Sequence, residues 1–244
     1  MARAWIGCSG WVYDHWVGVL YPPGLAKARW RQAYTDAFDT VELNASFYRW
    51  PGTRRFQDWG RSLPDGFRMA VKASQWISHR RRLVDPEGAW ARRLTEAWEG
   101  LGDRAGPVLV QLPADHPPDL GRLSAFLDGV PPRVPLAFEL RHPGWHDEAT
   151  YALLERHGAA YVVMSGANLR CELRATASFV YVRLHGPSPE HLYDQPYSDA
   201  DLAWWADRVR EWLAQDRDVW VYFNNDGRGW AVRNAQTLRR LLSA

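Results

Sequence analysis

Short β-branched and aromatic runs alternate along the chain with longer amphipathic stretches, and this alternation most restricts the folds open to it. Eight runs have the length and composition of buried strands: 4–8, 40–47, 67–74, 107–112, 136–141, 159–165, 179–185 and 219–225. Seven stretches have helical apolar spacing: 25–38, 54–63, 88–100, 120–127, 148–157, 201–213 and 230–242. Eight strands alternating with helices over 244 residues predict an α/β fold of the (β/α)8, or TIM-barrel, type.

A doubly wound open sheet is the alternative, because it also alternates strands with helices. In a dinucleotide-binding sheet of that kind, a glycine-rich turn leads directly from the first strand into a helix. Here Gly7-Cys8-Ser9-Gly10-Trp11 leads into a long loop instead. About a dozen residues separate Ser165 from Phe179, so the crossover between strands six and seven is expected to be irregular. With no repeat or linker in the pattern, residues 1–244 are predicted to form a single domain.

The composition excludes several classes of protein. With 46% hydrophobic and 24% charged residues, the chain can bury a core and is not disordered. No run approaches the roughly 18 apolar residues of a membrane span, and the first residues lack the apolar segment of a signal peptide, so a cytoplasmic protein without membrane contact is expected. Cys8 and Cys171 are distant in sequence and lack CxxC spacing, which argues against a disulfide framework or a structural zinc site.

The charge balance is neutral overall, but the choice of residues is unusual. A net charge of +2 from 30 basic and 28 acidic residues indicates no global attraction to nucleic acid or membranes. Only Lys27 and Lys72 are lysines and the other basic residues are arginines, so a lysine inside a strand is a candidate for a role that guanidinium cannot fill. The 15 tryptophans exceed what a core needs; some are expected to stack on flat ligands, and more than half to pack.

Charged and amide side chains lie inside the predicted strands, in phase with one another. Side chains of a barrel strand alternate between the interior and the helix layer, and ligands bind at the carboxyl ends of the strands. If Val41 and Leu43 face the helices, Glu42 and Asn44 face the interior. The same alternation predicts further inward positions at Lys72, Gln111, Glu139, Arg141, Arg183, His185, Tyr222 and Asn224, with Asn225 and Asp226 following the last strand.

Two explanations account for five inward charges. Each buried charge costs several kcal/mol unless it is paired. The charged side chains of Glu42, Glu139, Lys72, Arg141 and Arg183 either neutralise one another as a structural network or are compensated by a ligand. The set has one surplus positive charge, which favours an anionic ligand.

The predicted loops at the carboxyl ends of the strands add candidates. The run Ser78-His79-Arg80-Arg81-Arg82 follows the third strand, and arginine suits bidentate capture of carboxylate or phosphate, although such runs are often only solvated surface. The loops 11–16 and 142–146 combine aromatic rings with imidazoles, as a site for a planar or sugar-like group needs. Trp11 and Trp145 are therefore candidate ligand contacts, with packing beneath their loops as the alternative.

The order of these motifs resembles the YecE-like family, also known as domain of unknown function seventy-two. The resemblance spans nearly the whole chain and implies a TIM-barrel fold, but no established reaction. Two departures from the family pattern are Ala45, where serine is common, and the strand end Met164-Ser165, where aspartate is frequent. The resemblance rests on Gly7-Cys8-Ser9-Gly10-Trp11, Thr40-Val41-Glu42-Leu43-Asn44, Phe47-Tyr48, Val71-Lys72-Ala73 with His79, Glu139-Leu140-Arg141-His142 with Trp145, Tyr181-Val182-Arg183-Leu184-His185-Gly186 and Tyr222-Phe223-Asn224-Asn225-Asp226.

Three functional hypotheses follow. The first is an enzyme or binder for a small anionic or sugar-like ligand, with Glu42 or Glu139 as base, His185 or His79 as acid, and Lys72, Arg141 and Arg183 as electrostatic clamps. The second is a metal-dependent phosphoesterase or nuclease, which the interior cations disfavour. The third is a non-catalytic binder of a metabolite or nucleic acid. No metal or cofactor is predicted, and the oligomeric state is left open.

The candidate residues fall into two groups. The candidate catalytic residues are Glu42, Lys72, Glu139 and His185. The candidate ligand-binding residues are Trp11, Asn44, Tyr48, His79, Arg141, Trp145, Arg183, Asn224 and Asn225.

Overall fold

The computed structural model describes residues 1–166, 171–188 and 193–243. Its strands are β1 Ala4–Cys8, β2 Thr40–Leu43, β3 Arg68–Lys72, β4 Ala105–Leu112, β5 Leu136–Leu140, β6 Ala160–Ser165, β7 Phe179–Leu184 and β8 Asp218–Phe223. Its α-helices are α1 Trp30–Ala37, α2 Ala45–Tyr48, α3 Thr53–Ser62, α4 Ala89–Leu101, α5 Leu120–Gly129, α6 Glu148–Arg156, α7 Asp199–Ala214 and α8 Trp230–Ser243. The strand order β1-β8-β7-β6-β5-β4-β3-β2, with helices between the strands, is that of a (β/α)8 TIM barrel and confirms the predicted fold class.

The chain divides into two compact units, each described by itself below. Unit 1 comprises residues 1–42, 163–173 and 178–244, and unit 2 comprises residues 43–162 and 174–177. Unit 1 therefore draws on both ends of the chain, whereas unit 2 is nearly continuous in sequence.

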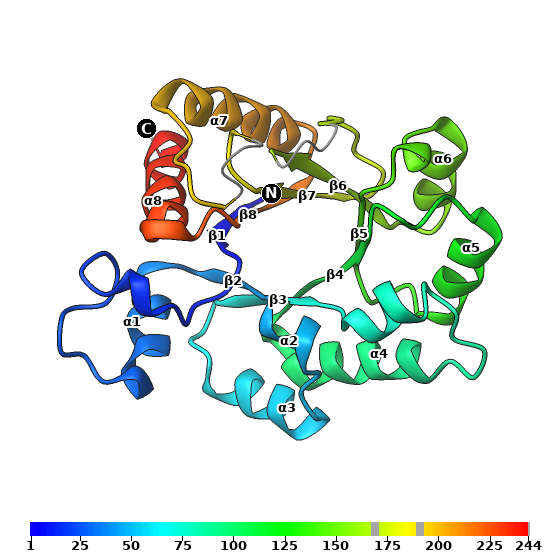
Figure 1. Ribbon diagram of the computed structural model, residues 1–244, viewed down its shortest axis with the longest axis horizontal. Coiled ribbons are helices and arrows are strands. Elements are labelled where there is room, and N and C mark those ends of the chain that lie inside the picture. The colour runs from blue at the N-terminus through cyan, green and yellow to red at the C-terminus, as the bar shows by residue number, and fades with distance from the viewer. Residues whose placement is uncertain (167–170, 189–192, 244) are drawn as a thin grey trace. The chain divides into compact units, whose positions relative to one another are not determined.

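In unit 1, β7, β8 and β1 pair in parallel, with α7 and α8 along their outer side (Figure 1). Ala4 of β1 aligns with Val219 of β8, and Arg183 of β7 aligns with Tyr222 of β8. A single bridge joins Ser9 to Glu42 of β2. Aligned residues of parallel strands point to the same side of the sheet, so Arg183 and Tyr222 share one face.

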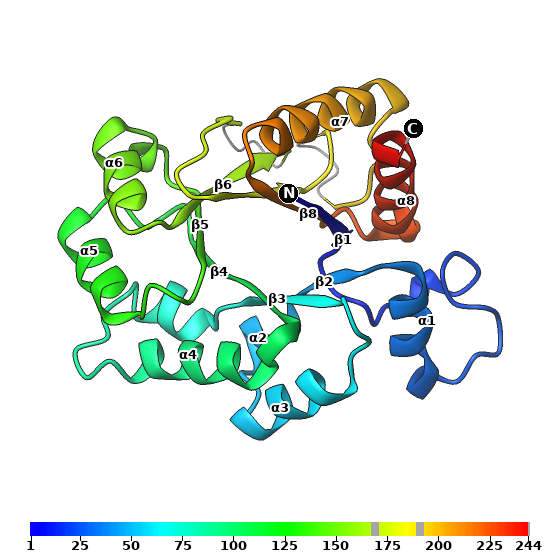
Figure 2. The ribbon, with the colours of Figure 1, turned by 180° about the vertical axis from the view of Figure 1, so that it is seen from behind.

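In unit 2, β3, β4 and β5 pair in parallel, with α4, α5 and α6 beside them (Figure 2). One face of these strands is apolar and packs into a core with the three helices. The core contains Ala73, which directly follows β3, and Val108, Val110, Leu112, Leu136, Phe138 and Leu140 of β4 and β5. Because side chains alternate along a strand, the residues between them face away from the helices, as predicted.

A bulge at the start of β4 lies before Lys72 and Gln111, so it does not change the alternation at the carboxyl ends of the strands. Between the β3 residues Met69 and Val71, β4 advances from Ala105 to Val108, which is one residue more. The extra residue falls at Gly106-Pro107, residue types that often mark such irregularities. Beyond it the register is regular, and Lys72 aligns with Leu109.

Most predicted boundaries lie within two residues of the observed ones, and the larger differences are the start of α1, at Trp30 instead of residue 25, and the end of β2. The strand predicted over 40–47 ends at Leu43, and residues 45–48 form α2 instead. The hydroxyl oxygen of Ser46 lies 2.7 Å from the Leu43 carbonyl and 2.6 Å from the Lys72 carbonyl, which ties this turn to the end of β3. At α7, a capping box between Ser198 and Asp201 starts the helix at Asp199, two residues before the predicted start.

The crossover from β6 to β7 is irregular, as expected. Its residues 171–178 form neither helix nor strand, and residues 167–170 lie outside the described part. Among the described helices, none is long and apolar enough to cross a membrane.

Candidate functional site

Three polar side chains of unit 2 face away from its helices at the carboxyl end of the sheet. Gln111 of β4 aligns with Glu139 of β5, and Lys72 of β3 aligns with Leu109, two residues before Gln111. Period-two alternation therefore places Lys72, Gln111 and Glu139 on one face. All three are buried. Burial of two ionisable groups on one face requires compensation by neighbouring charges or hydrogen bonds.

Part of that compensation comes from Arg141, just beyond the end of β5. Its Nε donates to Oε1 of Glu139 at 2.6 Å, and the carboxylate of Glu139 is fully buried. The Arg141 side chain keeps 21% of its surface exposed. The side chain of Arg141 therefore binds an interior carboxylate and stays partly exposed.

Lys72 is held against an aromatic ring. Its Nζ lies 4.3 Å from the centroid of the Phe47 ring, a cation–π contact made by the residue before Tyr48 at the end of α2. The ring of Phe47 also meets the imidazole of His79 edge-to-face, with 4.9 Å between centroids. The ammonium of Lys72 and the imidazole of His79 therefore both contact the ring of Phe47.

His79 lies in a π-helical turn, Trp76–Arg80, that follows β3. Isolated π-helical turns are frequent at functional sites. Burial lowers the pKa of His79, and the positive charges of Lys72 and Arg141 lower it further, against weaker opposing effects of Asp115 and Glu139. His79 therefore experiences a positive electrostatic potential from Lys72 and Arg141 together.

The basic run after β3 is only partly solvated. Arg82 is bound to the loop after β4, with 2.8 Å between its Nη2 and Oδ2 of Asp115 and a further contact to the Asp115 carbonyl. The guanidinium of Arg80 lies 5.7 Å from the Trp76 ring. Arg82 thus links the loop after β3 to the loop after β4, and the carboxylate of Asp115 neutralises its charge.

In unit 1, Glu42 of β2 is enclosed by donors. The guanidinium of Arg183 donates to both carboxylate oxygens, at 3.0 and 2.8 Å, and the Tyr181 hydroxyl donates at 2.6 Å. The hydroxyl of Ser9 donates to the same carboxylate. Glu42 and Arg183 are both fully buried. This geometry favours the structural-network explanation for the Glu42–Arg183 pair, and a role of Glu42 as base stays a prediction.

The remaining polar candidates of unit 1 form hydrogen-bonded pairs at the carboxyl ends of β7 and β8. The side-chain amide of Asn224 lies 3.0 Å from Nδ1 of His185. Asn225 is buried, and its amide donates to Asn234 and to the Gln195 carbonyl. The amide nitrogen of Asn225 therefore joins the end of β8 to α8.

The aromatic candidates differ in exposure. Trp145 is completely buried, and its indole nitrogen donates to the His116 carbonyl at 2.9 Å, so packing accounts for this ring. Trp11 is 8% exposed and meets Tyr34 edge-to-face. Tyr48 is 72% exposed, which leaves its ring open to a ligand. Asn44, just before α2, is partly exposed.

Five tyrosines of unit 1 have raised pKa values, mainly because of burial: Tyr21, Tyr34, Tyr181, Tyr197 and Tyr222. For Tyr197 the pKa is raised to about 12. Their hydroxyls bond within the unit, as Tyr222 does with Thr40 at 2.7 Å.

Stability is expected to fall as the pH rises above 10. The unfolded chain releases tyrosine protons at about pH 10, while the folded chain retains them, so each buried tyrosine lowers the free energy of unfolding by up to about 1.4 kcal/mol per pH unit until its folded pKa is reached. Tyrosinate absorbance measured with circular dichroism tests this, because these five rings should ionise only as the fold is lost. Ionisation of all 10 tyrosines near pH 10 with the fold intact would contradict it.

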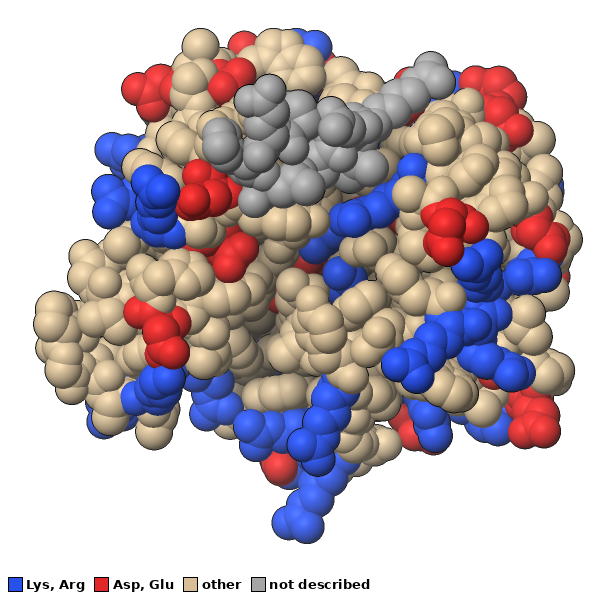
Figure 3. Space-filling view, viewed as in Figure 1, with Lys and Arg blue, Asp and Glu red and all other residues tan. Residues whose placement is uncertain are grey.

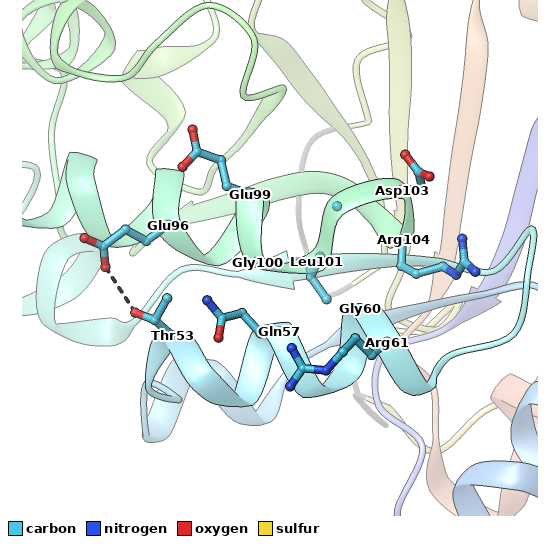
Figure 4. A pocket seen from close by; sticks show the side chains of 11 residues that line it. Thr53, Gln57, Gly60, Arg61, Glu96, Glu99, Gly100, Leu101, Asp103 and Arg104 are labelled. Carbon is cyan, nitrogen blue, oxygen red and sulfur yellow. Dashed lines mark hydrogen bonds between the residues drawn. The ribbon is translucent and has the colours of Figure 1, made fainter.

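A separate groove of about 620 Å³ lies between α3 and α4 in unit 2, and it holds none of the candidate residues (Figure 4). Thr53 donates a hydrogen bond to Glu96 at its edge, at 3.1 Å. Gly60 approaches the carbonyls of Gly100 and Leu101 too closely for any side chain, so the two helices are in tight contact beside the groove. The groove is therefore a consequence of the packing of α3 against α4.

A family model described as "Protein of unknown function DUF72" matches residues 5–244. The chain belongs to the DUF72 family. This confirms the resemblance seen in the sequence motifs. A DUF72 protein of *Thermotoga maritima* has a solved crystal structure that is 28% identical, covers 99% of this chain and 100% of that one, and superposes with a TM-score of 0.87. A DUF72 structure from *Enterococcus faecalis*, at 17% identity and a TM-score of 0.83, shares the fold.

Two curated relatives of this DUF72 chain carry UPF0759 names. YunF of *Bacillus subtilis* is 27% identical over 268 residues, covering 98% of this chain and 94% of that protein. YecE of *Escherichia coli* K12 is 30% identical over 140 residues, covering 57% of this chain and 48% of that protein. The similarity to YunF thus extends over the full TIM-barrel fold.

Several residues around the DUF72 candidates escaped sequence reasoning. Ser9 and Tyr181 bind Glu42, and Tyr181 shares the strand phase of Arg183, so period-two alternation could have found it. Phe47 and Ser78 contact Lys72 and His79; both lie in motifs named in the sequence analysis, but strand alternation does not extend to the helical turns that hold them.

His116 was also missed. It is 3% exposed, and neither ring nitrogen has a hydrogen-bond partner among the described residues. Its ring lies edge-to-face with Trp145 beneath the loop after β4, with 5.9 Å between centroids. Burial is the main cause of the lowered pKa of His116, followed by the charges of Arg82 and Arg122. His116 is thus a neutral packing residue of this loop.

Proposed function

We propose that this DUF72 protein binds a small anion, bearing a phosphate or carboxylate group, through Lys72, His79 and Arg141 at the carboxyl ends of β3 and β5. The observation that carries the proposal is the excess of positive charge in this cluster. Lys72 and Arg141 both lower the pKa of His79, and their effects exceed the opposing effects of Asp115 and Glu139. A positive potential of this kind attracts an anion.

The position of the cluster supports the proposal as well. The carboxyl ends of TIM-barrel strands are where ligands bind in this class of fold. Arg141 is partly exposed, and a guanidinium is suited to bidentate contact with carboxylate or phosphate. Tyr48 offers an exposed ring one residue beyond the Phe47 ring that holds Lys72.

Replacing Arg141 with glutamine is expected to weaken phosphate binding about 10- to 100-fold, because a hydrogen bond to a charged group is worth about 1.5–3 kcal/mol. Glutamine retains a donor for Glu139 but removes the charge. Isothermal titration with inorganic phosphate measures the effect. Arg54→Gln, on the exposed surface of α3, is the matched control and should bind phosphate as the unmodified chain does.

Equal phosphate affinity in Arg141→Gln and Arg54→Gln would count against the proposed site. Failure of the unmodified chain to bind phosphate, with no thermal stabilisation at high concentration, would refute the proposal. A ligand present at 100 times its dissociation constant should add about 2.7 kcal/mol to the free energy of unfolding.

The alternatives gain no specific support. Among the residues that the structure describes, no three histidine, cysteine, aspartate or glutamate side chains gather to hold a metal ion. Figure 3 shows lysine and arginine side chains in several groups on the face drawn, with acidic residues near some of them.

A further inference from the structure

Ser74 and Ser78 determine which ring nitrogen of His79 carries a proton. The hydroxyl oxygen of Ser78 is 3.0 Å from the Ser74 carbonyl oxygen and 2.9 Å from Nδ1 of His79. A carbonyl oxygen only accepts, so the single hydroxyl proton of Ser78 must point to Ser74; otherwise two oxygen lone pairs would face each other. The Ser78 oxygen is then the acceptor toward His79, and Nδ1 of His79 carries a proton.

This assignment fixes the other nitrogen of the ring. A neutral imidazole has one N–H and one lone pair, so Nε2 of His79 is an acceptor. His79 is neutral at and above pH 7, because burial, Lys72 and Arg141 lower its pKa and outweigh Asp115 and Glu139. These four charged groups come from β3, from the loop after β4, and from β5 and its end. No described residue hydrogen-bonds to Nε2, which leaves that lone pair available.

We propose that Nε2 of His79 accepts a hydrogen bond from the bound anion, so that the site selects oxyanions that carry a proton over those that do not. The inference rests on the proposed anion site and adds its selectivity. Lys72 and Arg141 attract any anion, whereas the lone pair of His79 repels an unprotonated oxygen. Hydrogen phosphate and sulfate separate these two effects, since both are tetrahedral dianions at pH 8 and only phosphate carries a hydroxyl.

The test is isothermal titration of the full chain with inorganic phosphate and with sulfate at pH 8. Phosphate is expected to bind about 10- to 100-fold more tightly, the difference made by one hydrogen bond in a charged site. His79→Asn places an amide where Nδ1 was, keeps a group near Ser78, and has no atom at the Nε2 position. In that variant the two anions should bind with nearly equal affinity.

Ser78→Ala tests whether the selectivity depends on the position of the proton on His79 and not only on the presence of its imidazole. The variant keeps the imidazole but removes the acceptor that holds the proton on Nδ1, so the preference for phosphate should shrink toward that of His79→Asn. Nitrogen-15 NMR of the histidine rings reads the proton position directly, and it should report Nδ1–H for neutral His79 in the unmodified chain and a shift toward Nε2–H in Ser78→Ala. A residue that only maintained the fold would not produce this spectral change.

Each outcome bears on a different claim. Equal binding of phosphate and sulfate by the unmodified chain, or tighter binding of sulfate, overturns the selectivity and leaves the anion site standing. So does an undiminished phosphate preference in His79→Asn, or an Nε2–H signal for neutral His79. Binding of neither anion overturns the anion site and the selectivity together.

Discussion

Arg183→Met is expected to lower the free energy of unfolding by about 3–5 kcal/mol, because removing one partner of a buried ion pair leaves the other charge uncompensated in the interior. Arg183 supplies two of the hydrogen bonds around the fully buried carboxylate of Glu42. Methionine fills much of the vacated volume without supplying a donor. Urea unfolding followed by tryptophan fluorescence measures the loss.

Two further variants calibrate this result. Arg210→Met breaks an exposed pair with Asp207, at 2.9 Å on α7, and should cost no more than about 1 kcal/mol. The double variant Glu42→Gln with Arg183→Met also removes the uncompensated carboxylate of Glu42, so it should recover much of the stability lost in Arg183→Met alone. A cost for Arg183→Met as small as that for Arg210→Met would mean that the Glu42–Arg183 pair does not hold β2 and β7 in place.

The second large effect is expected at Gly7, in the middle of β1. A Cβ atom added there would meet the carbonyl oxygen of Thr40 well inside 3.0 Å, closer than real Cβ contacts come. Relief requires β1 or β2 to move, so Gly7→Ala should lower the free energy of unfolding by about 3 kcal/mol, the upper part of the usual range for overpacking. Thermal or urea unfolding gives the value.

Gly121→Ala is the matched control for Gly7→Ala. Gly121 lies in the first turn of α5. A Cβ atom added to it would lie 3.6 Å from Oδ1 of Asp119, which is an ordinary contact. Alanine favours the helix over glycine by roughly 0.5–1 kcal/mol, so this variant should be neutral or slightly more stable. A neutral Gly7→Ala would show that β1 and β2 approach each other less closely than described.

The barrel fold and the inward positions of Lys72, Gln111 and Glu139 were predictable because both depend on short periodicities. Strand parity needs only neighbouring residues, and the bulge at Gly106-Pro107 lies before the site, where it does not invert the phase of Lys72. Arg183 and Glu42 were predicted on inward faces for the same reason, and the structure brings them together.

What escaped prediction depends on contacts between segments distant in sequence. The early end of β2 follows from a serine hydroxyl that bonds to a carbonyl of β3, 26 residues away. The neutralisation of Arg82 follows from Asp115 on another loop. The direction of the Ser78 proton depends on a π-helical turn that no apolar pattern indicates. A single sequence carries no local signal for any of these.

The pairing of β1 with β8 imposes an order on the synthesis of this protein. Ala4 leaves the ribosome well before its partner Val219, because most of the chain lies between them. Residues 43–162, most of unit 2, are complete long before that, and domains fold as their residues become available. Residues 1–42 therefore lack the strand partner of β1 and the Arg183 guanidinium that binds Glu42 until β7 and β8 have been made.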